Sequence, residues 1–313
     1  MVKVESGLFN RLSGTLQKSR TTFQTRKTGI VAEKKPIPPP DPRGRRECIR
    51  WIYRYLCDKW NTLSEQEKEQ YSETAEKHNI TLFNAFLKEE LTPRLWKCKL
   101  SKIDGQVLYL PFVEGEGNSL RDFSGQNNHG TIIDATWQKD EKKVYLDFDG
   151  EDDYVVIPES DSLTIQSDLT IEVWANFKRY ASPVEYQLLV HRDAPEATDY
   201  ALCVTRNNLR LVYLGNGEWR ALDFYPDFPL NTWLHIVAVR EGTYAYGYVN
   251  GELKNSANLG AIADYLPNPL TIGRGYFDDD FAPCMIGIIC IYNRALSSDE
   301  IKQHYELTKK YFE

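Results

Sequence analysis

Three aromatic side chains are candidates for binding a sugar. Trp219, Tyr225 and Tyr276 sit in or beside predicted loops, and an exposed aromatic ring can stack on the apolar face of a sugar. The same rings would also serve as edge packing of a β-sandwich, so the sequence leaves both interpretations open. Next to Tyr276, the segment Asp278-Asp279-Asp280 is interpreted first as a solvated acidic loop and second as the rim of a ligand site.

A run of carboxylates could hold a hard cation. Residues 147–153 (DFDGEDD) concentrate the oxygen ligands that Ca²⁺ prefers. The run is not an EF-hand loop, because its glycine comes too early and Pro158 stands where the bidentate glutamate belongs. The alternative interpretation is a turn that is rich in Asp and Gly for conformational reasons alone.

The residues of a catalytic site are not assembled. None of the five histidines lies in a Gly-x-Ser-x-Gly or HExxH setting, and His235 is interpreted as structural. A sandwich glucanase would need carboxylates alternating along one strand, whereas Glu172 is followed by Val173, Trp174 and Ala175. We therefore predict that the protein is not an enzyme.

Residues 105–313 alternate between short apolar segments and turn signals. Segments such as 169–177 and 285–292 are separated by turns that include Asn250-Gly251. About ten to fourteen strands within roughly 200 residues indicate a mainly β fold, a sandwich of two antiparallel sheets. A closing helix should begin at the capping box of Ser297 and Glu300. Its residues Ile301, His304 and Tyr305 are expected to lie against the sandwich.

Residues 44–97 have a helical pattern and predict three short helices. Apolar residues recur at helical spacing in the first of them. Fewer than about 60 residues would bury only a minimal core, so we expect this region to need a partner in assembly. The residues that mark the starts and ends of the later helices are Ser64 with Glu67, Asn79, Thr81 and Pro93.

Residues 1–43 predict a basic extended arm. Residues 1–60 hold 14 Lys and Arg against 5 Asp and Glu, a net charge of +9, while the rest of the chain carries −16. Such an arm contacts acidic proteins, nucleic acid or membranes, or is a solvated tail. Residues 21–28 have strand-like composition and should order only on assembly, and residues 36–42 read as a stiff proline spacer.

The β region resembles laminin-G-like, concanavalin A-like jelly-roll domains. The motifs that carry the likeness occur in the order expected for that family. They are 108–112 (LYLPF), 114–117 (EGEG), 122–131 (DFSGQNNHGT), 148–158 (FDGEDDYVVIP), 170–174 (TIEVW), 231–238 (NTWLHIVA), 248–251 (YVNG) and 287–297 (GIICIYNRALS). This resemblance implies the concanavalin-like jelly-roll fold for residues 105–313 and glycan binding, adhesion or display as functions. It also implies calcium held by Asp122, Asn128 and Asp149.

The first hundred residues resemble small structural proteins of phages and prophages, through residues 6–14 (SGLFNRLSG), the basic stretch, the proline run and the spacing from Trp60 to Phe86. The helical spacing in this part is also explained by a bare three-helix core.

The six cysteines and the N-terminus indicate in which cellular compartment the protein is made. No CxxC pair occurs, which argues against a zinc ribbon, and Cys48 and Cys57 lie too far apart on one helix to bridge each other. We expect buried free thiols rather than disulfides. No apolar stretch has the length of a signal peptide or of a membrane span, so the sequence predicts synthesis in the cytoplasm without ordinary export.

A domain of an extracellular type lies on a chain in which no export signal is recognised. A virus explains this combination, because it assembles in the cytoplasm and reaches the outside of the cell by release. We predict a virion structural protein, assembled in the host cytoplasm as a homo-oligomer with other virion proteins through residues 1–97. Residues 105–313 would then decorate the particle or attach it to a host cell-surface glycan, and nucleic acid would meet only the basic arm. The alternative is a non-viral carbohydrate-binding or adhesion protein that is exported by an unrecognised route.

Overall fold

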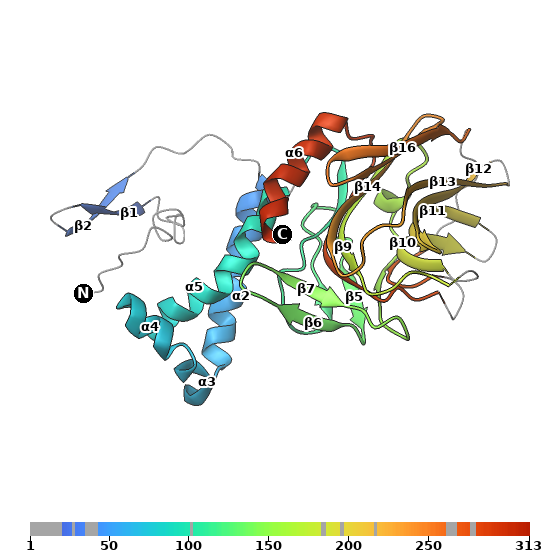
Figure 1. The fold of residues 1–313 in the computed structure, drawn as a ribbon. Helices are drawn as coiled ribbons and strands as arrows, with labels where there is room; N and C mark the ends of the chain where they lie inside the picture. The colour runs from blue at the N-terminus through green and yellow to red at the C-terminus, as the bar shows by residue number, and fades with distance from the viewer. Residues whose placement is uncertain are drawn as a thin grey trace.

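Two stacked β-sheets form a sandwich in the computed structural model, and helices from both ends of the chain lie against one side of it (Figure 1). The structure describes residues 21–26, 29–34, 43–100, 103–182, 186–194, 197–215, 218–260, 268–275 and 280–313. The proline spacer at 36–42 and most of the predicted arm lie outside these ranges. Within the arm, strands β1 (Thr21–Arg26) and β2 (Gly29–Lys34) pair antiparallel.

The described residues form a sandwich of two antiparallel sheets, as the sequence predicted, but with eight strands in each sheet where about ten to fourteen were expected in total. Sheet 1 has the order β13-β12-β11-β10-β17-β8-β5-β4, and sheet 2 has the order β16-β15-β14-β9-β18-β7-β6, with β3 paired to β18. The strands of sheet 1 are β4 (Ser119–Leu120), β5 (Gly130–Ile133), β8 (Tyr154–Ile157), β10 (Tyr186–Ala194), β11 (Ala197–Thr205), β12 (Asn208–Gly215), β13 (Glu218–Pro226) and β17 (Leu270–Ile272). The strands of sheet 2 are β3 (Gln106–Leu110), β6 (Thr136–Lys139), β7 (Val144–Asp147), β9 (Leu169–Phe177), β14 (Trp233–Glu241), β15 (Tyr244–Val249), β16 (Glu252–Asn258) and β18 (Cys284–Tyr292).

The central strand β9 explains why sheet 2 is covered on both faces. All nine of its residues are buried, although side chains alternate between the two faces of a strand. Ile171 and Val173 point into the sandwich core. Trp174 points the other way, into a second apolar cluster between sheet 2 and the helices.

The α-helices form two groups, one before and one after the sandwich, and the short η2 lies within it. The structure confirms both predicted capping boxes and the N-cap at Thr81. The helix predicted between Ser64 and Asn79 is interrupted at Gln70 and Tyr71, and the next helix continues past Pro93, where it was expected to end. The elements are α2 (Arg43–Thr62), α3 (Glu65–Glu69), α4 (Ser72–His78), α5 (Leu82–Leu95), η1 (Trp96–Leu100), η2 (Asp161–Leu163), α6 (Ser298–Thr308) and η3 (Lys309–Tyr311).

The N-terminal helices share a core with the sandwich, so the predicted three-helix region has no separate core of its own. One cluster contains Ile52 and Phe86 from these helices together with Trp174 of sheet 2. Phe312 at the chain end links the two parts, because its ring stacks on Trp174 at 4.2 Å and meets Trp96 edge-on at 5.4 Å. The marginal size of the helical region is thus offset by burial against sheet 2.

A buried lysine, Lys97, connects the N-terminal helices to the sandwich by hydrogen bonds. The Nζ of Lys97, which is fully buried, donates to the carbonyl oxygens of Phe112 at 3.0 Å and Gly287 at 2.9 Å, and also to that of Val144. Burial lowers the pKa of the Lys97 ammonium well below its ordinary value. One side chain therefore supplies the donors for carbonyls from three separate segments.

A disulfide joins Cys48 of α2 to Cys98 of η1, with a Cα–Cα distance of 5.7 Å. The expectation of free thiols is wrong for this pair, because folding α2 against η1 brings together two cysteines that lie 50 residues apart. Cys203, Cys284 and Cys290 are buried free thiols, as expected, and Cys57 is a free thiol that is only half-buried. Among the described residues, no helix combines the length and apolar character needed to cross a membrane.

Candidate ligand-binding face

The outer face of sheet 1, turned away from sheet 2, lies on strands β10 to β13. Leu209 and Leu211 of β12 and Leu222 of β13 belong to the sandwich core. Because side chains alternate along a strand, Arg210 and Asp223 between them point outward. The N-terminal helices and α6 pack instead on sheet 2 (Figure 1).

Arg210 and Asp223 form a bidentate ion pair on this face. Nε donates to Oδ1 at 2.6 Å and Nη2 donates to Oδ2 at 2.8 Å. The hydrogen bonds to Asp223 raise the pKa of the Arg210 guanidinium above its ordinary value. The partly exposed side chains of Arg210 and Asp223 thereby hold each other in a fixed orientation. Nη1 of Arg210 makes no hydrogen bond to a described residue.

A small apolar cluster adjoins the ion pair across the strands. Cys203 pairs in register with Arg210 on one side and with Leu188 on the other. Leu188, Ala201 and Cys203 pack together on this face with the half-buried Val212. Burial raises the pKa of the Cys203 thiol to about 12, so this cysteine acts as a small apolar residue rather than as a nucleophile.

Trp219 is the most exposed large hydrophobic residue of the described chain, at 61%. It lies on β13, the edge strand of sheet 1, and shares a face with Ala221 and Asp223 because the three alternate along the strand. Its indole contacts no other ring among the described residues. The sequence predicted Trp219 in or beside a loop. The segment around it is charged and its apolar alternation is short, so the pattern did not indicate a strand.

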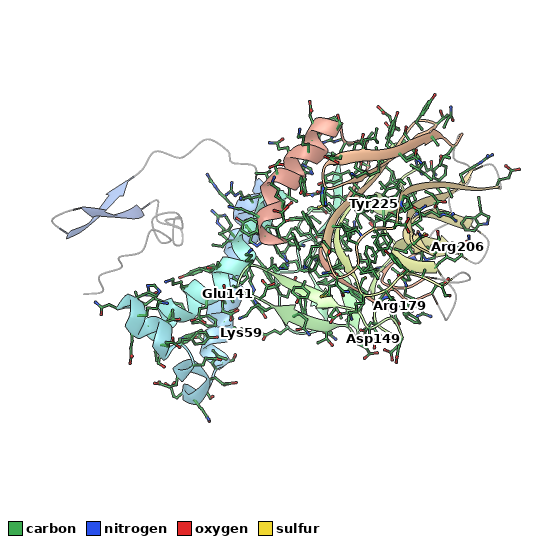
Figure 2. The ribbon with its side chains drawn as sticks, in the orientation of Figure 1. Lys59, Glu141, Asp149, Arg179, Arg206 and Tyr225 are labelled. Atoms are coloured by element: carbon green, nitrogen blue, oxygen red, sulfur yellow. A yellow bond between two sulfur atoms is a disulfide. The ribbon has the colours of Figure 1, made fainter. Side chains whose placement is uncertain are left out.

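The structure separates the other two predicted sugar-binding aromatics from Trp219. Tyr225 is also on β13, but a β-bulge opposite Leu209 and Arg210 turns it toward the sandwich core, against which it packs. The Nζ of Lys254 lies 5.5 Å from the centre of its ring. Figure 2 shows Tyr225 near the centre of the sandwich. Tyr276 lies outside the described residues.

A second chain segment borders the outer face next to Arg210. Tyr186, at the start of β10, is 44% exposed, and its backbone N–H donates to Oδ1 of Asp280 at 3.4 Å. Asp280 and Asp223 both act electrostatically on Cys203. The acidic segment 278–280, earlier a second choice for a ligand rim, therefore reaches this face at its one described residue.

The three proposed calcium ligands fall into two different settings. Both carboxylate oxygens of Asp122 accept hydrogen bonds, Oδ1 from the N–H groups of Tyr109 and Ser124 and Oδ2 from the Ser124 hydroxyl and the Asn128 N–H, at 2.7–2.9 Å. The Asn128 amide in turn donates to a backbone carbonyl and to a serine hydroxyl, both at 2.8 Å. These hydrogen bonds account for the burial of Asp122 and Asn128.

Asp149 lies instead in a group with Asp152 and Asp153, whose carboxylate oxygens are all within 4.8 Å of one another. Figure 2 shows Asp149 at the end of the sandwich below sheet 2. Calcium at either place stays a prediction.

A buried acid–base cluster lies under α6 and is closed to solvent. The carboxylate of Glu172 is hydrogen-bonded to His235 Nε2 at 2.8 Å and to His304 Nδ1 at 3.0 Å. It also accepts a hydrogen bond from the Tyr292 hydroxyl at 3.3 Å. Burial raises the pKa of the Glu172 carboxyl, but the two histidines outweigh this and hold it below its ordinary value. Both imidazoles and the carboxylate are at least 93% buried, so the cluster fastens α6 to sheet 2 rather than meeting a substrate.

Sequence reasoning missed Arg210 and Asp223, although the signal was present. Residues 215–217 (GNG) have the composition of a tight hairpin turn. Counting outward from a two-residue loop at 216 and 217 pairs Gly215 with Glu218 and hence Arg210 with Asp223, which is the observed register. The bulge that redirects Tyr225 has no comparable sequence signal.

Comparison with known proteins supports the fold. Residues 149–302 match the model of the concanavalin A-like lectin/glucanases superfamily in its laminin G form. No curated protein sequence matches the chain.

Solved structures with the same fold include receptor-binding domains of clostridial toxins. The chain is 18% identical to that of botulinum neurotoxin C/D mosaic serotype, with a TM-score of 0.55, over 65% of this chain and 51% of that one. It is 17% identical to the binding domain of paraclostridial mosquitocidal protein 1, with a TM-score of 0.55, over 64% and 52%. For the botulinum neurotoxin D ligand-binding domain in complex with N-acetylneuraminic acid, the identity is 19% and the TM-score 0.54, over 65% and 51%. The chain thus spans about half the length of these structures.

Proposed function

Starting from a concanavalin-like sandwich, matched to its superfamily over residues 149–302, we propose that the chain binds carbohydrate on the outer face of sheet 1. The observation that carries the proposal is the 61% exposed Trp219 on the same strand face as the Arg210–Asp223 pair. An exposed indole costs solubility, and Trp219 stacks on no ring of the described residues, whereas an indole is well suited to stack on a sugar ring.

The polar groups near Trp219 can form the hydrogen bonds that a bound sugar requires in addition to ring stacking. The Asp223 carboxylate accepts hydrogen bonds from sugar hydroxyls, and Nη1 of Arg210 can donate to a hydroxyl or to the carboxylate of an acidic sugar. Both are already oriented by their mutual bidentate contact, so little side-chain entropy is lost on binding. The N-acetylneuraminic acid in the similar botulinum neurotoxin D domain supports an acidic sugar as one ligand class.

The biological setting follows from weak single-site binding. One sugar contact gives a modest net free energy of binding because polar groups are desolvated, and repeated copies raise the effective affinity.

We propose display of the domain on a virion, as a host attachment or decoration protein, on the basis of the likeness of the N-terminal part to phage structural proteins. The alternative remains a non-viral adhesion protein, and neighbouring capsid, portal or tail genes would distinguish the two.

A glycan array probed with the multimerised full-length chain tests the proposal, using the variants W219A and Y244A. Tyr244 is a matched control, since it is 47% exposed but lies on sheet 2. We expect W219A to lose about tenfold in affinity, the scale of a lost aromatic contact, while Y244A binds as the wild type does. Absence of any glycan signal, or equal loss in both variants, would leave only a structural decoration role.

A further inference from the structure

Helix α2 carries a row of arginines on its exposed side. Arg46, Arg50 and Arg54 follow one another at intervals of four residues, and all three are exposed. Residues at this spacing lie one above another on one face of a helix. The opposite face of α2 is buried in the core shared with sheet 2. We call the three residues the arginine face.

The arginine face lowers the stability of the helix that bears it. Like charges four residues apart repel by about 0.2–0.5 kcal/mol per pair. Arg45 adds a further exposed positive charge in the first turn, which contains no acidic residue and where the helix dipole already favours anions. Arg50 and Arg54 form no ion pair with a described residue, so no ion pair of their own offsets the repulsion between these two arginines.

The same chain carries a complementary surface on its next two helices. Glu69, Glu73 and Glu76 at the end of α3 and on α4 are exposed, and none forms an ion pair within the described ranges. We call these three residues the acidic knob. Glu73 and Glu76 lie three residues apart on α4 and therefore share a helix face.

Geometry keeps the two surfaces of one molecule apart. The 20 residues of α2 span about 30 Å, and the arginine face occupies the part that begins at its N-terminus. Figure 1 shows α3 and α4 at the other end of α2, projecting away from the sandwich. Each surface is therefore available to another molecule.

We propose that the arginine face of one copy binds the acidic knob of a second copy, so that the chains associate head to tail through residues 43–80. Two different patches in contact make a heterologous interface, which builds a ring or a filament rather than a closed two-fold dimer. A second copy fits better than nucleic acid, because the rest of the chain after residue 60 carries a net charge of −16 and would repel phosphates. This inference goes beyond carbohydrate binding and involves none of the residues proposed for it.

Analytical ultracentrifugation of the full chain tests the proposal with paired charge reversals. Because the contact joins exposed charges, we expect self-association in about 50 mM salt that weakens at least tenfold in about 500 mM salt. R50E/R54E and E73R/E76R should each weaken it at least tenfold, and an equimolar mixture of the two variants should restore association, with the two variants alternating in equal numbers. R179E/R206E is the matched control, since Figure 2 shows both arginines on the sandwich, away from α2, α3 and α4.

Three outcomes would overturn the proposal. The first is a wild type that stays monomeric at low salt, and the second is association that R50E/R54E leaves unchanged. The third is a mixture of reversed variants that fails to associate although both keep the wild-type melting temperature. Loss of binding to a labelled DNA duplex in R50E/R54E, with self-association intact, would assign the arginine face to nucleic acid instead. Glycan binding by monomers is measured separately, so neither result decides the other.

Discussion

At the residue scale, Lys97 ties the helical region to the sandwich by hydrogen bonds, beside the apolar contacts of the same junction. Its Nζ is the shared donor for carbonyls of Phe112, Val144 and Gly287. We predict that Lys97→Met, which keeps most of the volume but none of the donors, lowers the free energy of unfolding by about 3 kcal/mol. Urea denaturation measures this change. Lys302→Met, at an exposed position of α6, should alter it by less than about 0.5 kcal/mol.

Calcium binding also belongs to the residue scale. The carboxylates of Asp149, Asp152 and Asp153 repel one another when close, and a bound cation would relieve this. If calcium binds, a concentration a hundredfold above its Kd should raise the melting temperature by about 5 °C or more. Asp149→Asn should abolish the shift, while Asp122→Asn should destabilise the fold even with chelator present. A metal-free protein with the same melting temperature in millimolar calcium would contradict the site.

At the element scale, the docking of α6 depends on pH through His304. Burial lowers the pKa of this imidazole, but Glu172 beside it outweighs burial and raises the pKa above the ordinary 6.5. The charged contact is therefore fully present below pH 6.5 and is lost as the pH rises through the raised value.

We predict that the stability advantage of the wild type over His304→Gln is about 2 kcal/mol near pH 6 and shrinks toward pH 9. Chemical denaturation of both proteins across this range measures it. The other groups facing Glu172 are His235 and the Tyr292 hydroxyl, and both are unchanged in the variant. A difference that is constant with pH would show that His304 acts only through packing.

The disulfide is the second element-scale feature. Closing a loop between Cys48 and Cys98, which are 50 residues apart, stabilises the fold by about 4 kcal/mol through the unfolded chain. We expect Cys48→Ser/Cys98→Ser to unfold at lower denaturant than the oxidised wild type. In reducing buffer the two proteins should unfold at nearly the same denaturant concentration. A wild type that reduction does not affect would show that the bond does not form in solution.

Local signals in the sequence were sufficient for several elements. Ser64 with Glu67 and Ser297 with Glu300 marked helix starts because a capping box is contained within four residues. The interruption at Tyr71 depends instead on burial of its ring against Phe86, a contact between different helices. Likewise Trp219 could be singled out as an aromatic, but its strand and its exposure depend on pairing with β12.

At the scale of the whole molecule, sequence patterns gave the two-sheet fold but not the relation between its parts. Trp174 and Phe312 lie 138 positions apart and stack only because the chain end returns to sheet 2. The N-terminal helices and the chain end together cover the outer side of sheet 2, while no described helix packs on the outer face of sheet 1. The ligand-binding proposal therefore depends on an asymmetry that arises only when all elements are packed.

The most direct test of carbohydrate binding on this face is NMR of the ¹⁵N-labelled tryptophan indoles during titration with a sialylated glycan. Of the seven indole N–H signals, those of Trp219 and Trp174 are assigned through the variants Trp219→Phe and Trp174→Phe. We predict a saturable shift of the Trp219 signal while that of Trp174, buried under α6, stays in place. Saturable binding that leaves the Trp219 signal unmoved, or that persists at full strength in Trp219→Ala, would contradict the proposal.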